Sequence, residues 1–487
     1  MIAAQALSHG VNAGDWTLAL RAARTLEGKD ALLPDARFLL LADAFRGRNW
    51  REAARQIDAI ERDELFAFAV PVLRAWRALG AGERDPLSLL PAEGASTIAA
   101  AYAADHRPLL LAAMGRPEGL TQLQATGAGG VRAMRRRIGA AGAYGKNGDW
   151  ERALQLLQGD GSPVAAARRL AEARRPIPGA IDGPAAGLAD FLVKIAIDLN
   201  AQDLTPLAAT FARLATWLAP DDGEGWIVAA ELARSQGRND AAVAMLATVG
   251  SEDPWFQAAR NERIRALIDS GRRDNALGEA QAAATASGAG ATDQVRLGEV
   301  LMSLDRPADA ALAFARAIEL RDETTSNYPE WALWLLRGGA HDEAGDWPQA
   351  RAALQQAHRL AAAEPLVLNY LGYAQLVRRE NVVEAERLIR EAHRLAPTNS
   401  AITDSLGWAL FLRGEREEAI NLLEQAAQGA PADVEINEHL GDAYFAAGRR
   451  AEARFAWTAA RVYAEGDAAT RLAAKIDTGL TPALAAR

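Results

Sequence analysis

The 487-residue sequence contains no cysteine, which excludes disulfide bonds, thiol catalysis and cysteine-ligated metals. This absence is compatible with a protein of the cytoplasm or of the periplasm. No uncharged apolar run approaches the roughly 20 residues that a membrane-spanning helix needs. We therefore expect a chain without a membrane span.

Positive charge is scarce relative to negative charge. Lys and Arg together number 54 against 63 Asp and Glu, which gives a formal net charge of −9. A protein that binds the nucleic-acid backbone needs a basic footprint. The charge balance therefore argues against nucleic acid as the partner.

Motifs that carry catalytic chemistry are missing as well. The six histidines show no metal-ligand spacing such as His-Glu-x-x-His. No Gly-Lys-Ser/Thr follows a glycine-rich stretch to hold phosphates, and no Gly-x-Ser-x-Gly elbow is present. We expect no enzyme activity, no cofactor and no metal site.

What the sequence does contain favours helices. Half of its residues are hydrophobic and alanine, the best helix former, is abundant, whereas aromatic residues make up 6%. Alternation of polar and apolar residues, which is typical of strands, is hard to find. The composition predicts an all-α protein.

One pattern recurs three times between Pro365 and Ala464, at a spacing of 34 or 35 residues. Each copy has a Leu-Gly pair, at Leu371-Gly372, Leu406-Gly407 and Leu440-Gly441. Alanines follow at two fixed places, first at Ala385, Ala419 and Ala453 and then at Ala392, Ala426 and Ala460. Pro397 and Pro431 close the first two copies. This pattern resembles the tetratricopeptide repeat, a helix-turn-helix unit.

The physical reason for the pattern is close packing of two antiparallel helices. Gly407 and Ala419 let the helices approach, while large apolar residues around them interdigitate with the next unit. Pro431 lacks the amide hydrogen that a helix interior needs, so it separates one unit from the next. Because no unit buries its apolar face alone, stacking builds a continuous core. The predicted fold is an α-solenoid, a right-handed superhelix of about a dozen helix pairs.

The pattern divides the chain into five predicted segments. Residues 1–174 form a divergent helical segment, in which Gly14-Asp15-Trp16 and Gly148-Asp149-Trp150 mark the turn before the second helix of a unit. Residues 175–187 collect Gly and Pro and predict a linker or loop. Residues 188–330 form a middle array, 331–467 a C-terminal array of close repeats, and 468–487 a capping helix and tail.

Two further groups of residues have both a functional and a structural interpretation. The basic cluster of Arg132, Arg135, Arg136 and Arg137 could hold an anionic partner, but a solvated helix face is favoured. Tryptophans open the second helices of four units, and packing is their favoured role. They are Trp16, Trp50, Trp150 and Trp347.

The resemblance extends beyond the generic repeat. Residues 365–373, 404–410, 436–444 and 448–457 resemble a family of multi-repeat proteins of alphaproteobacteria. Members of that family are usually exported, which implies the periplasm or cell envelope if an export signal ahead of Met1 was removed. Residues 1–15 contain no basic leader, and without such a signal the expected place is the cytoplasm.

Solenoids of this kind usually bind their partners along the inner face of the first helix of each unit. With Gly372, Gly407 and Gly441 counted as position eight, positions two, five, nine and twelve are aromatic at one level and acidic at the next. The predicted partner-binding groove is Asn369, Tyr373, Asp404, Trp408, Phe411, Glu438, Asp442 and Phe445. Since these positions hold no Lys or Arg, the predicted ligand is a peptide with basic and apolar character.

A structural role, as packing or solvation of the inner surface, is the alternative for this set. If the carboxylates serve binding, replacing Asp404 and Asp442 together with Asn is expected to weaken partner binding and leave thermal stability nearly unchanged.

The function predicted from the sequence is a non-catalytic scaffold or adaptor for proteins or peptides. A role in cell-envelope assembly is what the family resemblance implies. Two alternatives stay open. One is an obligate accessory or regulatory subunit of an envelope enzyme, and the other is a self-associating structural protein, for which a homo-oligomer would be the functional form.

Overall fold

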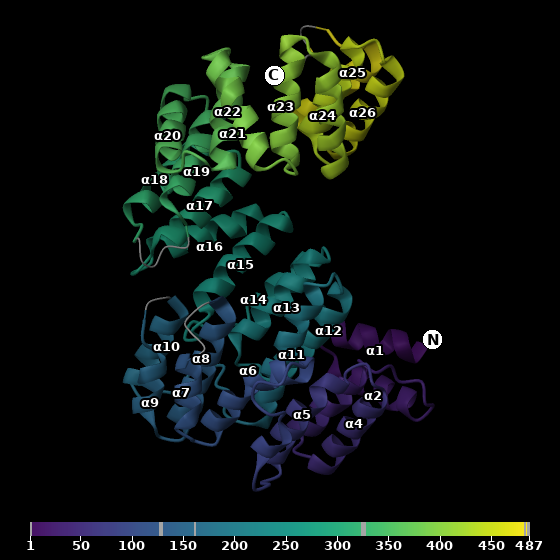
Figure 1. Ribbon diagram of the computed structural model, residues 1–487, viewed down its shortest axis with the longest axis vertical. Coiled ribbons are helices and arrows are strands. Elements are labelled where there is room, and N and C mark those ends of the chain that lie inside the picture. Colours follow the sequence, from purple (N-terminus) through teal and green to yellow (C-terminus); the bar gives the residue numbers. More distant parts are fainter. Residues whose placement is uncertain (1, 126–129, 160–161, 323–327, 482–483, 485–487) are drawn as a thin grey trace. The chain divides into compact units, whose positions relative to one another are not determined.

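The computed structural model describes residues 2–125, 130–159, 162–322, 328–481 and 484. Within these ranges the chain forms helices joined by turns and contains no strand (Figure 1). The predicted all-α fold is confirmed. The chain divides into two compact units, Met1–Ala283 and Ala284–Arg487.

The first unit begins with helix pairs and then adds a second array. Its earlier helices are α1 (Ile2–Ala13), α2 (Trp16–Glu27), α3 (Arg37–Arg46), α4 (Trp50–Arg62), α5 (Val70–Gly80), α6 (Ile98–Ala113), α7 (Glu118–Ala125), α8 (Gly130–Lys146), α9 (Trp150–Leu156) and α10 (Ser162–Glu172). Two short 3-10 helices, η1 (Ala67–Ala69) and η2 (Pro86–Leu89), flank α5. The second array is α11 (Pro184–Asn200), α12 (Thr205–Leu218), α13 (Gly223–Ser235), α14 (Asn239–Leu246), α15 (Phe256–Asp269) and α16 (Arg273–Thr285), whose end passes into the second unit.

The Gly-Asp-Trp turns fix where second helices begin. Gly14 and Gly148 have φ of 75° and 83°, a left-handed conformation that glycine adopts without strain. The aspartate that follows caps the next helix, since Asp15 accepts a hydrogen bond from the Leu18 amide at 3.0 Å. The sequence pattern therefore marks a turn followed by a capped helix.

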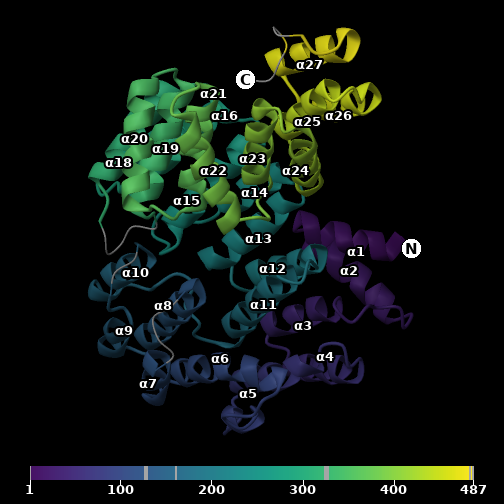
Figure 2. The same ribbon diagram turned by 45° about the horizontal axis from the view of Figure 1, so that its top comes forward.

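The second array of the first unit packs against the first array. Helix α11 contacts α3, α5 and α6, and α12 contacts α1 and α3, as Figures 1 and 2 show. Gly187 of α11 allows this approach, because a Cβ at that position would lie 2.2 Å from the Trp76 ring. Within the first unit, helices of the second array thus cover helices of the first array.

The predicted linker at residues 175–187 contributes to this core. Ile177 and Ile181 are buried, and the Ile181 amide donates to the Gly139 carbonyl at 2.9 Å. The segment is therefore packed rather than open. The five segment boundaries expected from the sequence stay a prediction, whereas the division into compact units falls between Ala283 and Ala284.

The second unit consists of successive antiparallel helix pairs. They are α17 (Ala291–Ser303) with α18 (Pro307–Glu319), α19 (Glu330–Glu343) with α20 (Trp347–Leu360), α21 (Pro365–Val377) with α22 (Val382–Leu395), α23 (Ser400–Arg413) with α24 (Arg416–Gly429), and α25 (Val434–Ala446) with α26 (Arg450–Tyr463), followed by α27 (Gly466–Thr478).

The small residues of the pattern lie where the helices of a pair touch. A Cβ on Gly407 would lie 2.8 Å from Leu423, and one on Gly441 would lie 2.3 Å from the Trp457 ring. Ala419 and Ala453 are fully buried. The packing role that the sequence predicts for these positions is confirmed.

Candidate functional site

The predicted groove residues lie on the first helices α21, α23 and α25 of the second unit. Residues three, four or seven apart on one helix share a face. By this rule Asn369 and Tyr373 share a face with Leu366, whose surface is 48% exposed. The other six lie in the same way on α23 and α25.

Helix α27 supplies cations to the acidic end of this face. The Lys475 ammonium, which is fully buried, donates to Glu438 at 2.6 Å and to both carboxylate oxygens of Asp442 at 2.8 Å. Arg471 makes a bidentate pair with Glu438 at 2.8 Å. Burial alone raises the pKa of Glu438, but Arg471 and Lys475 outweigh it and lower that pKa below its ordinary value.

The acidic groove positions, which hold no Lys or Arg themselves, are therefore compensated by side chains from other positions. Glu438, Asp442 and Asp404 are all buried and bound inside the protein. The sequence showed α27 only as a cap. Lys475 faces α25 because α27 packs against the last helix pair, α25 and α26. Partner binding by these positions stays a prediction.

Asp404 is bound by His439, a residue that sequence reasoning left out of the groove. The imidazole Nδ1 of His439 lies 3.0 and 2.9 Å from the two oxygens of Asp404. Its ring stacks on Trp408 with centroids 4.1 Å apart and an interplanar angle of 13°. His439 directly follows Glu438 and occupies position six of its repeat. This histidine was the feature of the sequence that could have pointed to a partner for Asp404.

The faces of α21 and α25 reach each other across α23. The Tyr373 hydroxyl on α21 donates to Glu435 on α25 at 2.7 Å. Burial and then Glu435 raise the pKa of Tyr373 above its ordinary value. Side chains from helices two pairs apart meet only on the inner side of a curved array, so this face is concave at Tyr373.

The remaining predicted residues are half-buried. Phe411 stacks on Trp408 with ring centroids 4.9 Å apart, and the ring centroids of Phe445 and Trp457 are 5.7 Å apart. The Asn369 side-chain oxygen is buried with no hydrogen-bond donor among the described residues. Leu366 and Glu435 are exposed members of the face, and the Glu435 side chain is 63% exposed.

The Asp404–His439 pair makes stability depend on pH. Burial by itself lowers the pKa of His439, but the Asp404 carboxylate outweighs it and raises that pKa above the ordinary value near 6.5. A raised pKa gives stability that is complete below about pH 6.5 and is lost as pH rises through the folded-state pKa. We expect the urea midpoint of the second unit to fall over that interval, and Asp404→Asn to remove this fall.

The first unit contains a separate buried charge cluster, formed by α8, α11 and α13. Arg135 is 1% exposed and donates to Asp222 at 3.0 Å and to the Gly179 carbonyl at 2.6 Å. Arg132 donates to Glu224 at 2.9 Å and to Asp190 at 3.1 Å.

The other two arginines of the basic stretch are also engaged. Arg136 pairs with Asp105, and Arg137 donates to the carbonyls of Leu156 and Gln158. The favoured interpretation of these arginines as a solvated face is therefore wrong. Their carboxylate partners come from helices as much as 92 residues further along the chain.

Burial shifts the acid groups of this cluster. It raises the pKa of Glu224 to about 7 and that of Asp253 to about 6, against the opposing effect of the arginines and backbone amides. Burial also lowers the pKa of His106 to about 4. The neutral His106 ring accepts a hydrogen bond from Trp76 Nε1 at 3.2 Å. These groups are enclosed. Glu224 is bound by Arg132 and Arg135, and Asp253 accepts hydrogen bonds from the backbone amides of Gly223 and Trp255.

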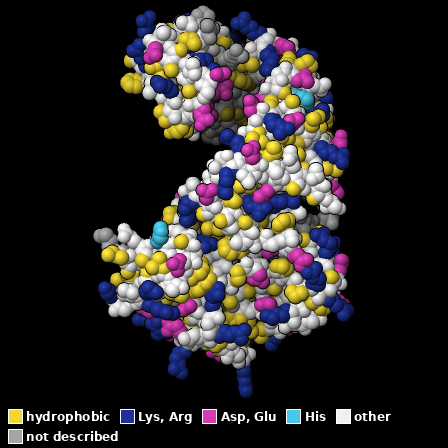
Figure 3. All heavy atoms as spheres, turned by 180° about the vertical axis from the view of Figure 1, so that it is seen from behind, with side chains coloured by type: hydrophobic (Ala, Val, Ile, Leu, Met, Phe, Trp, Pro, Cys, Tyr) yellow, Lys and Arg dark blue, Asp and Glu magenta, His cyan; other side chains and the backbone are white. Residues whose placement is uncertain are grey.

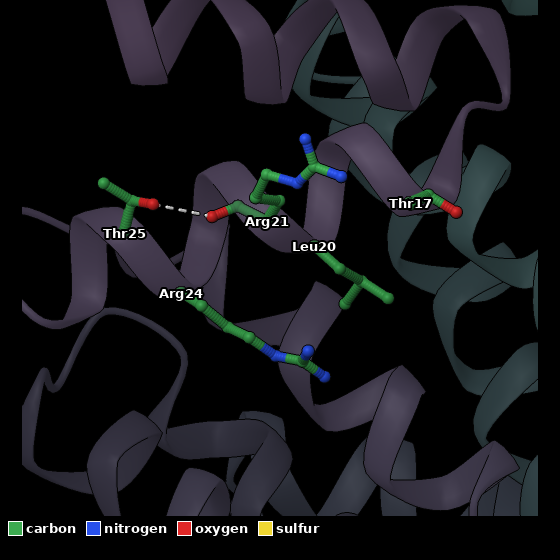
Figure 4. A pocket seen from close by; sticks show the side chains of 5 residues that line it. All are labelled: Thr17, Leu20, Arg21, Arg24 and Thr25. Carbon is green, nitrogen blue, oxygen red and sulfur yellow. Dashed lines mark hydrogen bonds between the residues drawn. The ribbon is translucent and has the colours of Figure 1, made fainter.

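Two surface hollows lie on the first unit near α2. One of about 500 Å³ is lined by side chains of α2 alone, at Thr17, Leu20, Arg21, Arg24 and Thr25 (Figure 4). The other, of about 530 Å³, lies between α2, α3 and α4, and its charges pair with one another, for example Arg24 with Asp43 at 2.7 Å. Neither hollow gathers a nucleophile with a base, so neither has the geometry of an active site.

The described part of the chain also lacks other site types. Nowhere in it do three or more His, Asp or Glu side chains gather to hold a metal. No helix within the described ranges combines the length and apolar character needed to cross a bilayer. On the face shown in Figure 3, basic and acidic side chains are interspersed.

Comparison with known families decides the repeat type. Residues 410–476, which cover α24 to α26 and most of α27, match the family described as tetratricopeptide repeat. Residues 410–476 therefore carry the tetratricopeptide repeat. The chain's tetratricopeptide fold class, an α-solenoid, is thereby confirmed, and this fold is that of a protein-interaction scaffold.

Several solved structures are similar to this chain at low identity. A tetratricopeptide repeat protein from Parabacteroides merdae is 12% identical over 52% of this chain and 97% of its own, with a TM-score of 0.41. A chain of the APC/C hetero-tetramer Cut9-Hcn1 is 13% identical over 98% of this chain and 95% of its own, with a TM-score of 0.42. MamA is 21% identical over 34% of this chain and 93% of its own, with a TM-score of 0.28. Among curated proteins no match is found.

Proposed function

We propose that this protein is a non-catalytic scaffold that binds a protein or peptide segment of basic and apolar character on the first-helix face of α21, α23 and α25. The observation that carries the proposal is the pair of exposed groups that remain on this face, Leu366 and Glu435. A role in assembling proteins at the cell envelope is part of the proposal through the family resemblance.

The internal ion pairs limit which carboxylates of this face can bind a partner. Because Glu438 and Asp442 already bind the Lys475 ammonium and Asp404 is bound by His439, these carboxylates add little free negative charge to the face. Glu435 accepts one hydrogen bond from the neutral Tyr373 hydroxyl and stays largely exposed. A Lys or Arg of the partner would meet Glu435, and an apolar neighbour would cover Leu366.

Binding to an array of synthetic peptides tests the proposed face. We expect peptides that place Lys or Arg beside Leu or Phe to bind better than the same peptides with Glu. Glu435→Gln keeps the acceptor for Tyr373 and removes only the charge, so affinity for the basic peptides should fall about two- to fivefold and its salt dependence should flatten. Glu417→Gln, an exposed carboxylate on α24, is the matched control and should leave affinity unchanged.

Peptides that bind equally to the parent, Glu435→Gln and Leu366→Ser would rule out this face as the recognition site. Capture from native extract then separates the classes of function. Several clients support a scaffold, whereas one stoichiometric envelope enzyme supports an obligate accessory subunit.

Self-association is the second candidate, and the outer face of α26 favours it. Phe455, Val462 and Tyr463 are 76%, 70% and 58% exposed, and Val462 and Tyr463 lie seven and eight residues after Phe455 on the helix. Exposed apolar groups of this size gather where a protein meets a partner. Sedimentation of the parent and of Phe455→Ser decides it, since a dimer that dissociates in the variant would support self-association.

A further inference from the structure

A layered stack of arginine and tryptophan side chains joins α2 to α12 in the first unit. Trp16, which opens α2, stacks on Trp217 of α12 with centroids 4.7 Å apart and an angle of 14°. The Arg213 guanidinium lies over Trp16 at 5.8 Å and over Trp226 of α13 at 5.6 Å. Trp16 was expected from the sequence to be a packing anchor, and it has that role here.

Arg213 is buried without a counter-ion. Its surface is 8% exposed, and no carboxylate in the described ranges pairs with it. Its one hydrogen bond to a side chain is long, at 3.5 Å to the Thr216 hydroxyl. A buried guanidinium normally has an anionic partner, because cation–π contacts replace only part of the hydration that it loses.

A second arginine makes the local excess of positive charge larger. Arg238 lies directly before α14. Burial of Arg213 and the positive charge of Arg238 together lower the pKa of Arg213. Arg238 donates from Nη1 to Asn12 at 2.9 Å. The Nε atoms of Arg213 and of Arg238 are both buried and find no acceptor among the described residues.

We propose that Arg213 and Arg238 form a binding site for an oxyanion group, a phosphate or a carboxylate, framed by Trp16 and Trp226. An oxyanion accepts hydrogen bonds from guanidinium donors and cancels the like-charge repulsion between the two arginines. This binding site lies in the first unit and is independent of the peptide-binding face proposed for the second.

The backbone leaves room for the guanidinium at this place. A Cβ on Gly14 would lie 2.6 Å from Arg213 Nη2, and the φ of 75° at Gly14 also favours glycine. Leu20, four residues after Trp16 on α2, lines the hollow of about 500 Å³ together with Arg21 (Figure 4).

Calorimetric titration of the full chain tests the oxyanion site, with inorganic phosphate and acetate as separate probes at constant ionic strength set by chloride. We expect saturable binding of at least one probe, and the arm that binds tells phosphate from carboxylate chemistry. Arg213→Gln should weaken that binding by about tenfold or more, since it removes a charged hydrogen-bond donor. The same probe should raise the melting temperature of the first unit in the parent.

Two further variants keep the test decisive. Arg238→Gln, at a half-buried position, should also weaken binding and does not depend on the fold tolerating a change at Arg213. Arg84→Gln, an exposed arginine of the same unit, makes the same charge change away from the cluster and should bind like the parent. The proposal is overturned if neither probe binds the parent, or if Arg213→Gln and Arg238→Gln bind as tightly as Arg84→Gln.

Discussion

Replacement of Arg135 by leucine is expected to destabilise the first unit by about 3–5 kcal/mol. Arg135 is almost fully buried and bonds to Asp222 and to the Gly179 carbonyl. Its Nε lies 3.2 Å from Glu224. Leucine fills part of the space but leaves two buried carboxylates short of positive charge, which is the costly way to break a buried ion pair.

Urea unfolding measures the effect of Arg135→Leu, and hydrogen exchange of residues 130–269 assigns it to the first unit. Arg169→Leu on α10 is the matched control, because Arg169 is exposed and its replacement should change stability by no more than about 0.5 kcal/mol. Adding Asp222→Asn to Arg135→Leu should restore part of the loss, since it removes a buried unpaired charge. Coincident unfolding curves of Arg135→Leu and the parent would show that the cluster contributes nothing.

Replacement of Lys475 by methionine is the second change with a large expected effect, again about 3–5 kcal/mol, now in the second unit. The Lys475 ammonium is fully buried between Glu438 and Asp442. Methionine keeps the length of the side chain and removes the charge. Asp442 then loses the Lys475 ammonium and lies buried beside Glu438, which keeps Arg471, so α27 should separate from α25.

Faster hydrogen exchange and proteolysis within α27 would report this separation. Arg461→Met on the exposed side of α26 is the control and should change stability by no more than about 0.5 kcal/mol. Glu438→Gln with Asp442→Asn in the Lys475→Met background should recover stability. An α27 that stays protected in Lys475→Met would mean that apolar contacts such as Leu472 hold it without the ion pairs.

The interactions of Asp404 and Asp442 inside the protein reverse one expectation from the sequence. Asp404→Asn together with Asp442→Asn was expected to leave thermal stability nearly unchanged. Since Asp404 binds His439 and Asp442 binds Lys475 and Trp457 Nε1, the double variant should lose stability as well. Glu435→Gln is the cleaner probe of recognition, because that carboxylate is exposed.

The sequence by itself determined the repeat unit and its local packing. Gly407, Ala419 and Pro431 act on their own helix and on the next one along the chain, so a period of 34 residues was enough to predict helix pairs and their contacts. The eight groove residues were placed correctly on first helices by the same local rule.

Only the tertiary structure decided which charges stay free. Arg135 meets Asp222 across 87 residues, and Lys475 meets Asp442 across 33. Helical periodicity shows which side of a helix a charge occupies, but not which other helix docks there. Electrostatic pairing depends on distances of a few ångströms, so the pairing of the groove carboxylates, the buried arginines and the unpaired Arg213 became visible only after the helices had packed.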